Sequence, residues 1–83
     1  MKITEAMKKI LDEFHRAEEI HPIWPMDQIH AAAIVVEEAG ELIRAALDYE
    51  FNGFKEEDIK YMRTEAIQTA AMAIRFLVNL PEE

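Results

Sequence analysis

The stretch from residue 29 to 47, IHAAAIVVEEAGELIRAAL, constrains this chain most, because its apolar residues cover far more than one face of a helix. A surface helix usually has an apolar arc of about 100° or slightly more, and here the arc is roughly twice as wide. The polar residues are confined to one narrow stripe: Asp27, His30, Glu37, Glu38, Glu41, Arg44 and Asp48. Because such a helix must be covered on two sides, we expect this stripe to lie between packed surfaces.

The length and composition predict one domain that associates with copies of itself. A chain of 83 residues buries only about 60–65% of its unfolded surface and is marginally stable alone. It has no cysteine, so it has neither a disulfide nor a cysteine metal site, yet 51% of its residues are hydrophobic. Together with the wide apolar arc, this composition predicts a homodimer or homotetramer with a shared core.

The net charge of −8 argues against binding to a nucleic acid polymer, because such proteins usually carry a basic patch. A nucleotide ligand is compatible with this charge, since a bound divalent cation can reverse the local sign. Residues 1–14 mix charges and lack the apolar core of a signal peptide. No apolar run approaches the roughly 18 residues of a membrane span. We therefore expect a cytoplasmic protein that does not bind a membrane.

Apolar spacing predicts three helices and no strand. The i, i+3, i+4 pattern predicts a first helix from Ile3 to about Ile20, with Thr4 as its N-cap. The prolines of residues 21–25 break this helix, and Asp27 suits the N-cap of the next one.

The second helix is expected to run to about residue 50 or 51 and to end at Asn52-Gly53, where a left-handed residue is needed. The third helix is expected to start between residues 56 and 58 and to run to Asn79. Its second half, TAAMAIRFLV, is apolar nearly all round, which predicts burial against more than one partner.

Glu37, Glu38 and Glu41 form an E-E-x-x-E motif within the polar stripe. Residues three and four apart are neighbours on a helix, so these carboxylates repel one another, and apolar flanks reduce the screening. Such a cluster favours a cation, and oxygen-only ligands suit Mg²⁺, with Mn²⁺ as the alternative.

Glu65 and Gln68 are three residues apart on the third helix. Antiparallel packing of the second and third helices would place Glu65 opposite Glu38 and Glu41. The alternative is that the acids form solvated ion pairs, with three basic residues as partners: Arg44, Lys60 and Arg63. The residues alone leave both interpretations open.

Two segments, WPMDQIHAAAIVVEEAGELIRAAL and EAIQTAAMAIRFL, together resemble the MazG-like nucleotide pyrophosphohydrolases, especially short phage-type members of the all-α NTP pyrophosphatase group. The resemblance covers roughly residues 24 to 78. It implies a small all-α bundle of three main helices that oligomerisation completes. It also implies Mg²⁺-dependent hydrolysis of a nucleoside triphosphate between the α- and β-phosphates, giving the monophosphate and pyrophosphate.

The family pattern is E-E-x-x-E followed by E-x-x-D on the next helix. The resemblance implies that Glu38, Glu41 and Glu65 are metal ligands. Glu37 would be a carboxylate behind the ligands or would help to activate the water. The family's aspartate falls on Gln68, which can offer a carbonyl oxygen as a fourth ligand but removes one negative charge.

The nucleotide itself also needs contacts. Four basic residues are candidates for the outer phosphates: Arg44, Lys60, Arg63 and Arg75. Trp24 is a candidate for stacking on the base, because aromatic faces stack well on bases, or it fills the end of the core. His30 lies on the acidic stripe and is either near the base or part of a polar network in the first turn.

Two other functions are weighed against this one. Glu18-x-x-His21 and Asp27-x-x-His30 resemble the acid-x-x-His pairs of a di-metal carboxylate bundle, although Pro22 interrupts the first pair. The other is a non-catalytic nucleotide-binding or regulatory oligomer, which the neutral Gln68 favours.

Overall fold

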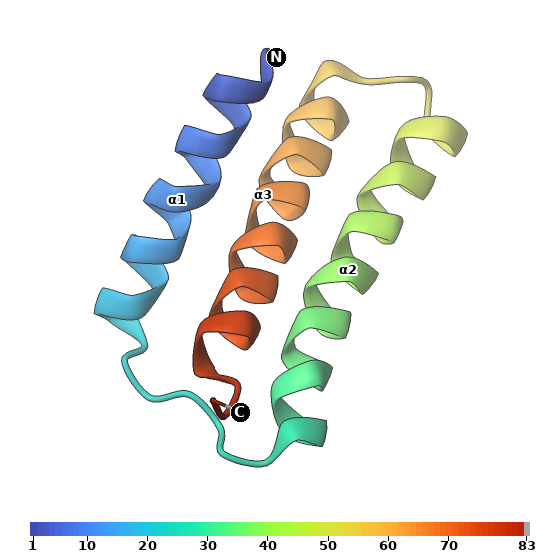
Figure 1. The fold of residues 1–83 in the computed structure, drawn as a ribbon. Coiled ribbons are helices and arrows are strands. Elements are labelled where there is room, and N and C mark those ends of the chain that lie inside the picture. Colours follow the sequence, from blue (N-terminus) through green and yellow to red (C-terminus); the bar gives the residue numbers. More distant parts are fainter. Residues whose placement is uncertain (83) are drawn as a thin grey trace.

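The computed structural model describes residues 1–82 and consists of three helices, without a strand in this range. They are α1 (Ile3–Ile20), α2 (Gln28–Phe51) and α3 (Glu56–Asn79), which confirms the all-α class and the expected helix boundaries. Figure 1 shows α2 and α3 as an antiparallel hairpin and α1 on the other side of α3. Among the described helices, none combines the length and apolar character that crossing a bilayer requires.

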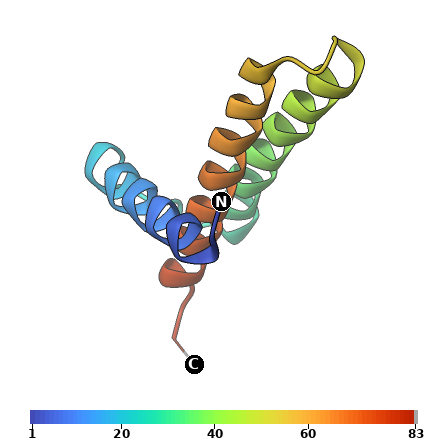
Figure 2. The ribbon, with the colours of Figure 1, turned by 90° about the horizontal axis from the view of Figure 1, so that it is seen from above.

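The central helix is α3, which packs against both α1 and α2. In the apolar second half of α3, Ala71, Met72 and Arg75 are buried, whereas Leu77 and Val78 are 67% and 61% exposed, so the predicted burial of this segment is confirmed only in part. Within residues 1–82, α1 and α2 make no direct packing contact, and seen from above α1 diverges from the α2–α3 hairpin, so that α1 and the hairpin form the two arms of a V (Figure 2). Since α2 packs only on α3, its wide apolar arc is not covered on two sides by this chain.

The helix ends follow local chemistry, with one exception. The side chain of Asp27 accepts a hydrogen bond from the Ile29 N–H at 3.2 Å, which confirms it as the N-cap of α2. The prediction that Thr4 caps α1 is wrong, because Lys2 occupies that position and no side chain caps the helix. The α1 helix therefore begins two residues earlier than a threonine cap would place it.

After α2 the chain turns through two residues with positive φ, Gly53 at 95° and Phe54 at 56°. The glycine is the expected left-handed residue. Phe54 is unusual there, and its position is held by two contacts with Tyr49: its N–H donates to the Tyr49 carbonyl at 3.1 Å, and the two rings meet edge to face at 5.3 Å.

The core is small and built mainly from alanine. The buried apolar residues of the described range are Ala17, Ala31, Ala45, Ala71 and Met72. Phe14, Trp24, Ile34 and Val35 pack against the part of the core formed by α1 and α3 but keep some exposure. No large side chain of residues 1–82 is fully buried, so one copy of the chain has little interior.

Two charged residues of the described range are buried, and Arg75 is the more deeply buried of them, with 3% of its surface exposed against 8% for Asp58. One guanidinium nitrogen donates to the His21 carbonyl at 2.6 Å and lies 3.0 Å from a Glu18 carboxylate oxygen. The guanidinium also lies over the Trp24 ring, 4.8 Å from its centre. Arg75 therefore ties the end of α1 and the following loop to α3, and these contacts occupy it within the fold.

Candidate metal centre

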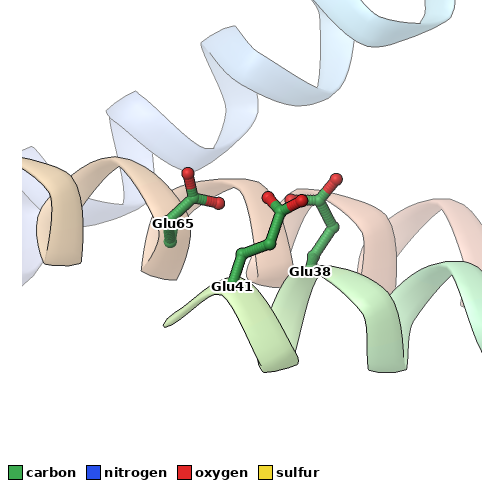
Figure 3. A group of neighbouring side chains, drawn as sticks. All are labelled: Glu38, Glu41 and Glu65. Atoms are coloured by element: carbon green, nitrogen blue, oxygen red, sulfur yellow. The ribbon is translucent and has the colours of Figure 1, made fainter. Parts of the chain in front are cut away.

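The acid cluster is made by two helices that run in opposite directions. Glu38 and Glu41 lie one turn apart on α2, and Glu65 lies opposite them on α3 (Figure 3). One carboxylate oxygen from each residue lies within 4.8 Å of the others. This is the juxtaposition that the spacing and antiparallel packing predicted, and it is the one such group of acids or histidines within residues 1–82.

Partial burial makes these carboxylates difficult to ionise together. Glu38 and Glu65 are half-buried, whereas Glu41 is exposed. Burial raises the pKa of Glu38, and the negative charges of Glu41 and Glu37 raise it further. Burial, followed by the hydrogen bond and charge of Glu41, raises the pKa of Glu65 to about 6. A divalent cation among these groups would relieve the repulsion that raises both pKa values.

Gln68 is half-buried and contacts the same cluster from α3. We assign the amide nitrogen to the side that faces the acids, because in that orientation it can donate to Glu65 and to Glu38, each at 3.2 Å. Rotation of the amide by 180° would aim its carbonyl oxygen at the same two carboxylates. Gln68 is thus positioned either to hold the acids by hydrogen bonds or to offer a neutral oxygen to a cation.

One hollow is lined by two of the acids, and a second is lined by Gln68 next to them. One, of about 250 Å³, lies between α2 and α3, where Arg44 and Tyr61 line it with Glu41 and Glu65. The other, of about 350 Å³, lies between α1 and α3 and reaches Gln68. The first of these spaces makes Glu41 and Glu65 accessible from the side between α2 and α3.

The lining of the second hollow includes residues of α1 that the sequence analysis did not select. Lys9, Glu13 and Arg16 lie there, and the guanidinium of Arg16 is held by the Glu13 carboxylate through two hydrogen bonds of 2.8 Å. The charge of Glu13 also contributes to the raised pKa of Glu38. In sequence these residues belong to the polar face of an amphipathic helix, and no local signal distinguishes them from solvated side chains.

Most of the other predicted nucleotide-binding residues do not line either hollow near the acids. Lys60 and Arg63 are exposed on α3 and do not line the two hollows beside the cluster. His30 is exposed in the first turn of α2. Trp24 packs against the core and under the Arg75 guanidinium. Arg44 is the predicted cation that lies in a hollow together with two of the acids.

The acid-x-x-His pairs are not gathered into a second site. Glu18 pairs with Arg75, His21 is the C-cap of α1, and Asp27 caps α2. None of them belongs to the group of acids that could share an ion in the described part of the chain.

Comparisons of the chain with family models, curated proteins and solved structures find no match.

The donor set fits a hard divalent cation. Three carboxylates from two rigid helices supply oxygen atoms alone, which suits Mg²⁺ or Mn²⁺ better than softer metals. Mg²⁺ binds oxygen at about 2.0–2.1 Å, so its ligand atoms lie at most about 4.2 Å apart. The carboxylate oxygens lie within 4.8 Å of one another, so they would move closer together to bind one ion.

Proposed function

We propose that this protein is a Mg²⁺-dependent nucleoside triphosphate pyrophosphohydrolase, which cleaves between the α- and β-phosphates. The observation that carries the proposal is the gathering of Glu38, Glu41 and Glu65 from two helices at one point, where Glu41 and Glu65 line an open hollow. The choice of a nucleotide substrate follows from the resemblance of residues 24–78 to the MazG-like family.

When bound, the divalent cation supplies positive charge to the triphosphate and polarises its phosphoryl oxygens. Glu38, Glu41 and Glu65 would hold the cation through their carboxylate oxygens. Glu37 is exposed next to Glu38 on the same stripe of α2, and we assign it to accept a proton from the attacking water. The water oxygen forms a bond to the α-phosphorus while the bond from that phosphorus to the bridging oxygen breaks, and pyrophosphate leaves.

Basic groups near the acids would neutralise the outer phosphates. Arg44 is the first candidate, because it lines the hollow that Glu41 and Glu65 also line. Lys9 lines the hollow on the other side and carries no side-chain hydrogen bond in the described structure. Positioning and charge neutralisation of this kind provide most of the catalysis in phosphoryl transfer.

The test is pyrophosphate release by the purified protein with a panel of nucleoside and deoxynucleoside triphosphates, first with Mg²⁺ and then with Mn²⁺. We expect Glu38→Gln to lower turnover by about a hundredfold or more, because it removes a metal-ligand charge. Glu50→Gln on the same helix is the matched control and should leave turnover unchanged. A folded protein that binds Mg²⁺ but releases no pyrophosphate from any substrate would contradict the proposal.

A second function is favoured by one observation, the neutral amide of Gln68 within the cluster. A site with one fewer negative charge could bind a nucleotide without turning it over, as a regulatory module would. The variant Gln68→Asp separates the two functions. If Mg²⁺-dependent turnover is present in the natural protein, it is an enzyme, whereas turnover only in Gln68→Asp would make the natural protein a nucleotide binder.

A further inference from the structure

One face of α2 carries an uninterrupted apolar stripe that the chain does not cover. The α2 stripe consists of Ile29, Ala33, Val36, Gly40, Ile43, Leu47 and Phe51. All seven residues are exposed, and the five large ones are 51% to 82% exposed. The buried residues Ala31 and Ala45 lie on the opposite side of the helix, which is the side that packs on α3.

The spacing within the α2 stripe is that of a helix-to-helix contact. Intervals of four and three residues alternate from Ile29 to Leu47, which is the heptad repeat that keeps one seam of a helix facing a partner helix. No charged residue interrupts this seam. On α1 the exposed apolar surface is shorter, because Ile3, Met7 and Leu11 are followed by Phe14 and Ala17, which pack into the core.

The surface area of one chain is larger than its mass requires. It exposes 6339 Å², whereas a compact monomer of 9.6 kDa exposes about 5,100 Å². The difference of about 1,200 Å² exceeds the roughly 800 Å² that each partner buries in a standard interface. Burial of this amount by each of two copies would give an interface in the range of obligate homodimers.

Gly40 lies at the middle of α2 and of the α2 stripe. Glycine is unfavourable in the middle of a helix unless another backbone approaches closely. Apart from the adjacent backbone of α2 itself, a Cβ atom placed on Gly40 would meet no atom of residues 1–82 within 4 Å, so no contact in this part of the chain explains a glycine there. A second helix that crosses α2 at Gly40 would explain the glycine, because its backbone could then approach closely.

We propose that the α2 stripe packs against the α2 stripe of a second copy of this chain, about a two-fold axis that passes close to Gly40. We place this axis perpendicular to the helices, so the two copies of α2 are antiparallel in the dimer. Leu47 then lies near Ala33 of the partner subunit, which pairs a large side chain with a small one. The small residues at the centre allow the two backbones to approach closely.

The ends of the interface also fit. An apolar groove of about 440 Å³ adjoins the α2 stripe, where Val36 faces Phe76 and Leu77 of α3. The antiparallel arrangement brings Phe51 of the partner subunit to this end of α2. Phe51 is 79% exposed in one copy, and the groove offers its ring an apolar surface. The carboxylates of Glu38, Glu41 and Glu65 remain outside this interface, so the proposal does not depend on the proposed function.

The test is sedimentation velocity over a range of micromolar concentrations. We expect the wild-type chain to sediment as a dimer and Ile43→Glu to weaken dimerisation by about a hundredfold or more, because two charges enter each interface. Ile3→Glu is the matched control, since Ile3 is 74% exposed and Ile43 is 62% exposed, and it should remain a dimer. A wild-type monomer, or equal behaviour of the two variants, would overturn the proposal.

Disulfide trapping tests the axis without relying on a destabilising change. The chain has no cysteine, so each variant has one thiol. Under oxidation, Gly40→Cys should form a covalent dimer, because residues at the axis come within disulfide distance, whereas Ile29→Cys should not. Preferential cross-linking of Ile29→Cys would indicate parallel helices and overturn the arrangement. A wild-type monomer that instead binds phosphatidylserine vesicles would assign the stripe to a lipid surface.

Discussion

At the scale of single residues, Glu65 links the acid cluster to pH. Its pKa of about 6 in the folded chain exceeds the ordinary value of 4.5, first because it is partly buried and then because Glu41 and Glu38 surround it. The folded state therefore holds this proton more tightly than the unfolded state does. The pKa of Glu38 is shifted in the same direction, so the effects of the two residues on stability have the same sign.

We expect the metal-free protein to lose stability as the pH rises through this window. The contribution of Glu65 is fully present below pH 4.5 and is lost as the pH passes about 6, and it amounts to at most about 2 kcal/mol. Urea unfolding in EDTA between pH 4 and 7.5 measures it, with Glu65→Gln for comparison. The difference between the two proteins should change across the window, and a difference independent of pH would contradict the expectation.

Gln68 and Arg75 show how much a single residue's role depends on its neighbours. Both are candidate functional residues in the sequence, one as a ligand and the other for phosphate binding. The structure places Gln68 against two of the acids, where it can serve the site. It places Arg75 away from solvent, on Glu18 and the His21 carbonyl, where its charge is used within the fold.

At the scale of elements, Arg75 is the contact through which α1 and the loop after it are held to α3. We expect Arg75→Ala to destabilise the fold by about 3 kcal/mol, because Glu18 and the His21 carbonyl lose their partner and Trp24 loses its packing. Thermal unfolding followed by circular dichroism measures the loss. Arg63→Ala, an exposed arginine of the same helix, is the control and should change stability by less than about 0.5 kcal/mol.

The helix boundaries are the part of the structure that local sequence predicts well. Apolar periodicity defines the length of each helix, and Asp27 marks the start of α2 because its carboxylate satisfies a free N–H. The start of α1 was predicted with the wrong cap, since at Lys2 solvent rather than a side chain serves the first turn. Phe54 was not predicted to be left-handed, because its conformation depends on the contact with Tyr49.

At the scale of the whole molecule, the small alanine core and the large exposed surface make stability depend on association. If two copies share the α2 stripe, folding and dimerisation are coupled. We expect the midpoint of thermal unfolding to rise with protein concentration, because a hundredfold increase favours the dimer by about 2.7 kcal/mol. Differential scanning calorimetry at several concentrations measures this, and a midpoint that does not move would indicate that the monomer is the stable unit.

The arrangement of the three helices determines what surrounds the candidate site. The antiparallel order of α2 and α3 follows from the short connection between two long helices, so the meeting of Glu65 with Glu38 and Glu41 was predictable. The position of α1 was not, because its apolar face could pack against either helix of the hairpin. Only the tertiary structure shows that it lies along α3.

The sequence by itself therefore determined three helices, their ends and the three acids that meet, because these follow from periodicity and from contacts between neighbouring elements. The tertiary structure decided that Lys9 and Glu13 line the same hollow as Gln68, that Arg75 is buried, and that the outer face of α2 is exposed. These features depend on which nonlocal surfaces pack together. Which of these surfaces pack together depends on the whole molecule, so it cannot be predicted from a local sequence pattern.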